Sequence, residues 1–159
     1  MNEPIDSLSQ IVAEYQLNYV QLHGGESVAY CREVKEKGIS IIKVFSVIDQ
    51  LDMGAIRSFE GIAEYFLFDT KTPGYGGSGR KFDWGILNQY DLKTPYLLSG
   101  GIGIEDFQYI LKKNFPGLIA LDVNSKIEAN QGRKNILAIK ELKSKIISNN
   151  DSYESISKV

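Results

Sequence analysis

Four polar side chains each stand at the carboxyl end of a different apolar, strand-like segment of this sequence. They are His23, Asp69, Ser99 and Asp122, and each precedes a glycine or a polar loop. In parallel α/β folds the carboxyl ends of the strands meet at one edge of the sheet, where ligands bind. A single such residue would be explained as a helix cap, but four at one edge predict a ligand site.

Asp69 and His23 are the members of this set that are suited to move a proton. Asp69 ends the apolar segment YFLFD, residues 65–69, and a carboxyl group in that setting is suited to protonate a substrate. The alternative is a structural carboxylate held by hydrogen bonds. His23 is the only histidine of the chain, and its position leaves both a structural and a functional role open.

Two glycine-rich regions could cover a ligand or bind an anion. The first, GYGGSG at 74–79, lacks the Gly-Lys-Ser/Thr ending of a P-loop. We interpret it as a loop that folds over substrate, with a plain surface loop as the alternative. The second combines SGG at 99–101, which precedes a predicted helix, with DVNS at 122–125. Their free backbone N–H groups together predict a phosphate site.

Composition excludes several other classes of function. The 159 residues carry a net charge of −2 without a basic stripe, so nucleic acid is not a predicted partner. No apolar run is long enough to span a membrane, and we expect a cytoplasmic protein. One histidine and one cysteine offer no metal-ligand cluster, so no metal is predicted. Cys31 has the apolar neighbours of a core thiol on a helix.

The elements that must position these residues alternate between strand and helix periodicity. Apolar, β-branched runs predict five strands, within 19–25, 39–45, 65–69, 94–101 and 118–125. Helices are predicted between them, and the last should turn Ile136, Ile139, Leu142 and Ile146 inward. Such alternation implies an α/β fold with a parallel sheet. We predict one domain over 1–148 and a polar, frayed tail over 149–159.

Four blocks of the sequence resemble the signature blocks of the phosphoribosylanthranilate isomerase family. They are VQLHGGE (20–26), LFDTKTPGYGGSGRKFDW (67–84), LSGGI (98–102) and LDVNSKIE (121–128). They occur in the family's order and spacing, and the resemblance extends to about Ile147. It implies a (β/α)8 TIM barrel that uses no cofactor, of which this chain would supply the last five strand–helix units.

The resemblance implies an Amadori rearrangement of a sugar phosphate in tryptophan biosynthesis. The substrate N-(5-phosphoribosyl)anthranilate becomes 1-(2-carboxyphenylamino)-1-deoxyribulose 5-phosphate. Matched to the family's motifs, Asp69 is the general acid. The residues expected to contact the rest of the substrate are His23, Asp122, Gly76, Gly77, Ser78 and Gly79. Those expected to bind its phosphate are Ser99, Gly100, Gly101, Asn124 and Ser125.

The chain departs from the family pattern in three respects. The family's general base is a cysteine in a KICG motif on its first strand, and a family arginine near the second strand contacts the anthranilate carboxylate. This chain has neither, and Cys31 lies in the wrong segment to replace the base. The chain alone is therefore expected to be inactive, with a missing N-terminal segment or self-association as expected partners. Lys126 replaces a common glycine and would be strained if that position needs a positive φ.

A second class of function stays open alongside the isomerase. It is a non-enzymatic α/β module with an open five-stranded sheet that binds phosphate or a protein partner. A flavodoxin-like or receiver-like domain is disfavoured, because the acid cluster expected at the end of the first strand is absent. An in-frame KICG segment in the coding DNA upstream of Met1 would favour the enzyme.

Overall fold

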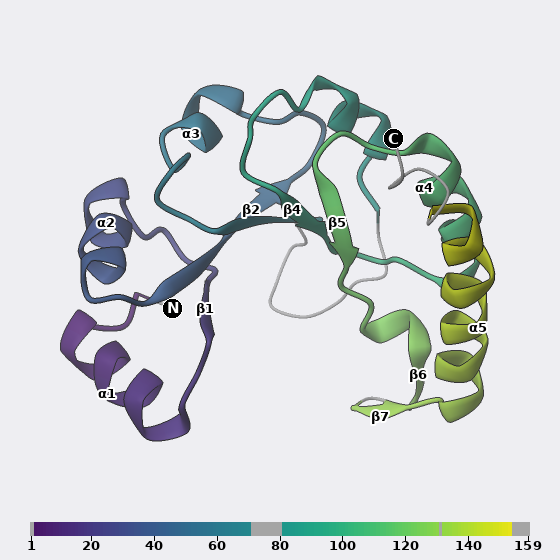
Figure 1. Cartoon of the computed structure of the whole chain (residues 1–159), viewed down its shortest axis with the longest axis horizontal. Coiled ribbons are helices and arrows are strands. Elements are labelled where there is room, and N and C mark those ends of the chain that lie inside the picture. Colours follow the sequence, from purple (N-terminus) through teal and green to yellow (C-terminus); the bar gives the residue numbers. More distant parts are fainter. Residues whose placement is uncertain (1, 71–80, 131, 154–159) are drawn as a thin grey trace.

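Five parallel strands form one sheet that curves into an arc, with the helices on its outer side (Figure 1). The computed structural model describes residues 2–70, 81–130 and 132–153, so the predicted substrate loop 74–79, with Gly76, Gly77, Ser78 and Gly79, lies outside the described residues. All neighbouring strands are parallel, in the order β1 (Tyr19–Leu22), β2 (Ser40–Val47), β3 (Tyr65–Thr70), β4 (Tyr96–Leu98) and β5 (Leu118–Leu121). This confirms the predicted α/β class and its five parallel strands.

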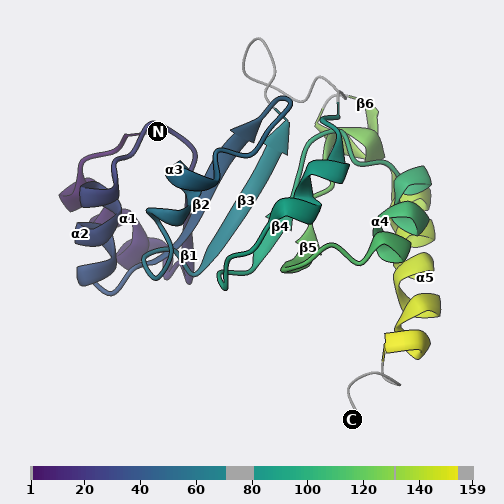
Figure 2. The ribbon, with the colours of Figure 1, turned by 90° about the horizontal axis from the view of Figure 1, so that it is seen from above.

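Helical segments precede, connect and follow the strands. They are α1 (Ile5–Tyr15), α2 (Val28–Glu36), α3 (Met53–Arg57), the 3-10 helix η1 (Trp84–Gln89), the 3-10 turn η2 (Ile104–Asp106) continued by α4 (Phe107–Lys113), the 3-10 turn η3 (Ser125–Ile127) and α5 (Ile136–Tyr153). Both views place α5 beside α4, next to the β5 end of the sheet (Figures 1 and 2). The curved sheet therefore has helices on one face, while the other face is turned to the inside of the arc.

Side-chain caps explain where several of these helices begin. Ser27 accepts a hydrogen bond from the backbone N–H of Tyr30, so α2 starts at Val28. Asp52 caps α3 in the same way by accepting from the N–H of Ala55. At the other end of α2, Gly38 has a φ of 79°, a conformation that ends a helix and favours glycine.

The last part of the chain differs most from expectation. Ile136 is 62% exposed and Ile146 is also exposed, so the prediction that both face inward is wrong; Leu142 does pack against the core. An unpredicted antiparallel hairpin, β6 (Glu128–Asn130) with β7 (Arg133–Lys134), precedes α5. The helix then continues to Tyr153, so the beginning of the predicted tail, 149–153, is helical.

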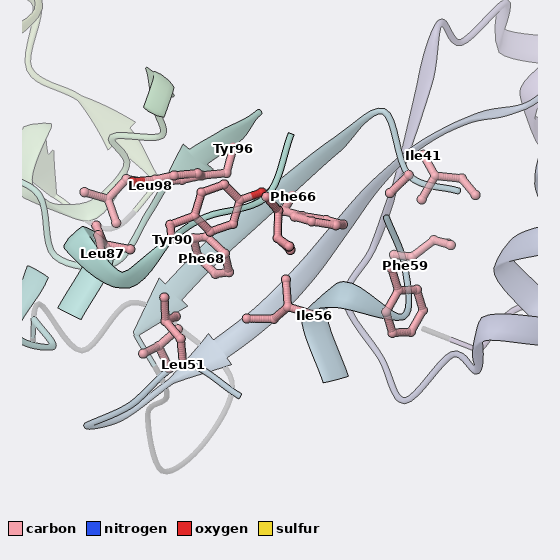
Figure 3. Close-up of a cluster of buried hydrophobic side chains, with 14 of the residues drawn as sticks. Ile41, Leu51, Ile56, Phe59, Phe66, Phe68, Leu87, Tyr90, Tyr96 and Leu98 are labelled. Carbon is pink, nitrogen blue, oxygen red and sulfur yellow. The ribbon is translucent and has the colours of Figure 1, made fainter. Parts of the chain in front are cut away.

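The core lies between the sheet and the helices on its outer side (Figure 3). Successive side chains of a strand point to opposite faces, and Phe66 and Phe68 of β3 are fully buried on the helix side. The ring of Phe68 lies 4.9 Å from that of Tyr96 and 5.8 Å from that of Tyr90, centroid to centroid. Because Phe68 faces the helices, its neighbour Asp69 faces the inside of the arc.

Removing the ring of Phe68 should destabilise the fold as a core cavity does. We expect Phe68→Ala to lower the free energy of unfolding by about 3–5 kcal/mol, measured by urea denaturation. Ile136→Ala removes a large apolar side chain from an exposed position, so it should change the free energy by less than about 0.5 kcal/mol. Equal losses in the two variants would contradict the described position of the core.

Candidate functional site

The four polar residues predicted from the strand ends lie on the inner face of the sheet, at its carboxyl edge. In the paired register Asp69 stands opposite Ser46 of β2. Beyond the end of β4, the N–H of Ser99 donates to the carbonyl of Phe68 at 2.8 Å, and the N–H of Asp122 donates to that of Leu98 at 2.8 Å. These bonds continue the ladder past the strands and fix both residues at the level of Asp69.

The side chains of this edge meet in two pairs. His23 Nε2 lies 4.0 Å from Asp69 Oδ2, and the two side chains are 43% and 28% exposed, so a ligand can reach both. Ser99 Oγ donates to Asp122 Oδ2 at 3.2 Å. The carboxyl group of Asp69 can thus interact with the imidazole of His23 or, when protonated, donate a proton to a ligand, while Asp122 orients the hydroxyl of Ser99.

The first predicted phosphate loop approaches the end of β3 closely. Gly100 and Gly101 have consecutive positive φ angles of 92° and 68°, a conformation that favours glycine. A Cβ atom on Gly100 would lie 2.3 Å from the side-chain oxygen of Thr70 and 2.6 Å from its backbone nitrogen. The hydroxyl of Thr70 is buried and has no hydrogen-bond partner among the described residues. Glycine at 100 is therefore required by both backbone conformation and space.

The second predicted phosphate loop, at Asn124 and Ser125, is held by a residue that the sequence analysis missed. Lys134, on β7, donates to the carbonyl of Asn124 at 3.1 Å, to the side-chain oxygen of Asn124, and to Glu128 at 2.8 Å. The bond from Lys134 and the N–H of Gly132 lower the pKa of Glu128. The only sequence signal was a lysine and a glutamate six residues apart around a glycine.

The backbone at Lys126 is not strained. Lys126 lies in η3 and does not have a positive φ. Among the described residues, the non-glycine residues with a positive φ are Asn2, Gln16 and Asn114. The condition under which lysine would be unfavourable at this position therefore does not hold. Its side chain is exposed.

A buried ion pair behind the site was also missed. Lys43 Nζ lies 3.0 Å from Glu26 Oε2, and the two side chains are 4% and 1% exposed. Burial acts to raise the pKa of Glu26, but the hydrogen bond from Lys43 and backbone N–H groups, that of Asn2 among them, outweigh it and lower this pKa. A lysine inside the apolar run ISIIKVF was the available signal, because a buried ammonium needs a partner.

Cys31 is a free, fully buried thiol on α2, as interpreted from the sequence. Burial raises the pKa of this thiol, so its reactive thiolate form is disfavoured. No group of three or more His, Cys, Asp or Glu residues suited to a metal occurs within 2–70, 81–130 and 132–153. In the same part of the chain, no helix is both long and apolar enough to cross a membrane.

Comparison with known proteins gives a consistent result. A model of the family described as N-(5'-phosphoribosyl)anthranilate (PRA) isomerase matches residues 1–145. The N-(5'-phosphoribosyl)anthranilate isomerase of Parabacteroides distasonis is 41% identical over 147 residues, which are 92% of this chain and 66% of that protein. The isomerase of Phocaeicola vulgatus is 39% identical over 150 residues, 92% of this chain and 73% of that protein.

Solved structures agree with the sequence relatives. The Thermotoga maritima phosphoribosyl anthranilate isomerase superposes with a TM-score of 0.74 at 33% identity, over 89% of this chain and 67% of that one. A structure of the isomerase with reduced 1-(o-carboxyphenylamino)-1-deoxyribulose 5-phosphate has a TM-score of 0.67 at 29% identity, over 89% of this chain and 65% of that one.

The parallel sheet and the polar residues at its carboxyl edge define an α/β protein with a polar site at the carboxyl ends of its strands. The chain belongs to the N-(5'-phosphoribosyl)anthranilate isomerase family. It spans about two thirds of the length of the relatives that it matches, 66% in one case and 73% in another.

Substituting Gly100 tests the tight loop of this site. We expect Gly100→Ala to destabilise the fold by at least about 1–3 kcal/mol, because alanine is strained at this φ and its methyl group would collide with Thr70. Gly25→Ala is the matched control, since a Cβ there meets no atom within 4 Å. Urea denaturation of the two variants measures the difference. A Gly100→Ala protein as stable as Gly25→Ala would contradict this loop geometry.

Proposed function

We propose that this chain carries the proton-donating and phosphate-binding part of a phosphoribosylanthranilate isomerase site. The observation that carries the proposal is the pairing of Asp69 with His23, 4.0 Å apart and accessible, at the carboxyl edge of the sheet. A related protein, 29% identical, is described in complex with reduced 1-(o-carboxyphenylamino)-1-deoxyribulose 5-phosphate. The proposed substrate is accordingly N-(5-phosphoribosyl)anthranilate, and the pathway is tryptophan biosynthesis.

In the proposed fold, these five units are the last five of an eight-unit (β/α) barrel. Two observations support this. The chain matches 66% of the length of one relative, and β1 and β5 each have one strand neighbour among the described residues. The inner face that carries Asp69 would then be the barrel interior, and the edge that carries the site would be its carboxyl-terminal end.

Asp69 acts first in the proposed reaction. Its carboxyl group protonates the ribose ring oxygen, so the C1–O bond breaks and the ring opens to a Schiff base with the anthranilate nitrogen. A base then removes the proton from C2 to give an enolamine, which tautomerises to the ketone. His23 lines the reacting centre beside Asp69, and an imidazolium there would stabilise the carboxylate that remains after proton transfer.

The phosphate of the substrate occupies the two loops at the β4–β5 side of the edge. The N–H of Ser99 is already bonded to the carbonyl of Phe68, so Gly100 and Gly101 would offer the backbone N–H groups of one loop. Asn124 and Ser125 would offer those of the other. The bonds that Lys134 makes to Asn124 hold the second loop in place. Asp122 accepts a hydrogen bond from Ser99 and so fixes the Ser99 side chain between the two loops. Asp122 also lines the proposed substrate site.

The base of the reaction is not assigned to any residue of this chain. Cys31, its one cysteine, is fully buried and burial raises the pKa of its thiol, so it is unsuited to remove the C2 proton. We therefore propose that a polypeptide of residues 1–159 is inactive alone and needs a segment that supplies the base. The alternative function is a phosphate-binding module without catalysis. It would use the same two phosphate loops but requires no role for Asp69.

Inorganic phosphate provides a test of the two loops. We expect phosphate to shift the backbone amide signals of residues 100–101 and 124–125 in NMR spectra, because anions bind free N–H groups. Chloride at matched ionic strength is the control and should leave these signals in place. Binding beside Arg133 with the loop amides unchanged would contradict the assignment.

Restored turnover distinguishes the enzyme from a binding module. The chain is mixed with the part of the Parabacteroides distasonis isomerase that lies outside the matched 147 residues, and conversion of N-(5-phosphoribosyl)anthranilate is followed. We expect no turnover from either part alone, turnover from the mixture, and a loss of about 10²–10⁴-fold with Asp69→Asn.

Asp91→Asn is the matched control in that assay, because Asp91 is an exposed partner of Arg57 and comes before β4, whereas the site lies beyond the carboxyl ends of the strands. It should leave turnover unchanged. Normal turnover in the Asp69→Asn mixture would remove Asp69 from its role, and turnover by the chain alone would show that a residue within it acts as the base.

A further inference from the structure

The ion pair between Glu26 and Lys43 has both of its side chains buried, unlike the other ion pairs of the described residues. It lies on the helix side of the sheet, where Lys43 also approaches the rings of Phe45 and Phe59 at 6.0 and 5.9 Å. Buried ion pairs add little net stability compared with apolar packing, so stability alone does not account for one here.

The bonds of this pair converge on the backbone around His23. Lys43 Nζ donates to the carbonyl of Leu22 at 3.3 Å and to that of Gly24 at 3.0 Å, the residues on either side of His23. The two carboxylate oxygens of Glu26 accept from the N–H of Gly24 at 2.8 and 3.1 Å. The peptide groups that flank His23 are thus held from behind by one ammonium and one carboxylate.

This arrangement replaces hydrogen bonds that the sheet does not supply at that position. β1 ends at Leu22, which is paired with Lys43, and within the described residues β1 has a neighbour on one side only. His23 is the first residue beyond the ladder. Without other bonds, its backbone would be free to turn, and the imidazole would lose its fixed position opposite Asp69.

Gly24 belongs to the same arrangement. A Cβ atom on it would lie 2.6 Å from Glu26 Oε1, so the carboxylate can approach the N–H of residue 24 because that residue is glycine. The sequence HGGE therefore carries a histidine, a close-approach position and the anion that binds there, within four residues.

We infer that Glu26 and Lys43 are positioning residues that hold the His23 imidazole against Asp69. The pair makes no contact with the proposed substrate and acts through the backbone at 22–24. An apolar pair of equal volume would fill the space, but the carbonyls of Leu22 and Gly24 and the N–H groups of Gly24 and Asn2 would lose these partners. The catalytic consequence rests on the proposed function, whereas the orientation of His23 does not.

His23 is the only histidine of the chain, so selective isotope labelling of histidine gives a single imidazole signal. In the unaltered chain, Asp69→Asn should shift this signal, because the carboxylate lies 4.0 Å away. In a Lys43→Met background, the signal should move to the position of an exposed histidine and cease to respond to Asp69→Asn. An unchanged signal with an unchanged response would overturn the inference.

Lys35→Met is the matched control for this experiment. Lys35 also binds a glutamate, Glu64, and a glycine carbonyl, that of Gly61. Its side chain is exposed, however, and its partners lie in the segment before β3 rather than beside His23. The control should keep both the His23 signal and its response. If it abolished them as Lys43→Met does, the effect would be general loosening of the fold and the inference would fail.

Lys43→Met leaves a buried carboxylate without its cation, which could unfold the chain. The double variant Glu26→Gln/Lys43→Met removes both charges and keeps an oxygen that can accept from Gly24. It should retain the circular dichroism of the unaltered chain yet release the His23 signal, because the carbonyls of Leu22 and Gly24 have lost their donor. A folded double variant with the original signal and response would overturn the inference.

Turnover separates this inference from the proposed function. In the two-part assay, the folded double variant should lose about 10²-fold in kcat, the scale of a misplaced group, with KM changing little. If no mixture turns over at all, the proposed function fails and the NMR result still decides the orientation of His23. If the His23 signal is released but kcat is unchanged, the positioning role in catalysis is overturned.

Discussion

The register of the parallel pairing between β2, β3 and β4 is the constraint on which the rest of the site depends. It sets Asp69 opposite Ser46 and, past β4, Ser99 beside the carbonyl of Phe68. Side chains alternate between faces, so a slip of one residue would turn Asp69 into the helix-packed core and Phe68 out of it. The buried ring cluster around Phe68 opposes such a slip and thereby fixes the acid on the inner face.

Sequence was sufficient for those parts in which local pattern and burial agree. The run YFLFD identified β3 and the acid near its end. The motif SGG identified the glycine loop at 100 and 101, where both φ angles are positive. Sequence patterns failed where long-range contacts decide. The hairpin of β6 and β7 is too short and polar to give a strand pattern, and the helical spacing of Ile136 did not reveal that little packs against it.

Buried charges were the other class of residue that pattern reasoning missed. Lys43 stands among apolar residues of a strand that was correctly predicted, yet its partner Glu26 is seventeen positions away, in the loop before α2. Pairing of this kind follows from the three-dimensional register, since Lys43 lies level with Leu22 across β1 and β2. A lysine in an apolar strand indicates that a carboxylate lies near it, but it does not reveal which carboxylate that is.

The contact between His23 and Asp69 also depends on the strand that separates them. β1 and β3 are second neighbours in the sheet, so their backbones are about 9–10 Å apart at the usual strand spacing. Their side chains nevertheless approach to 4.0 Å on the inner face of the curved sheet. The residue of β2 paired with Asp69 is Ser46, whose side chain is small and exposed. A bulky residue there would occupy the space between the two groups. The curvature of the sheet, the small residue on β2 and the bonds of Glu26 and Lys43 to the backbone on either side of His23 all accompany this approach of an acid and an imidazole from different strands.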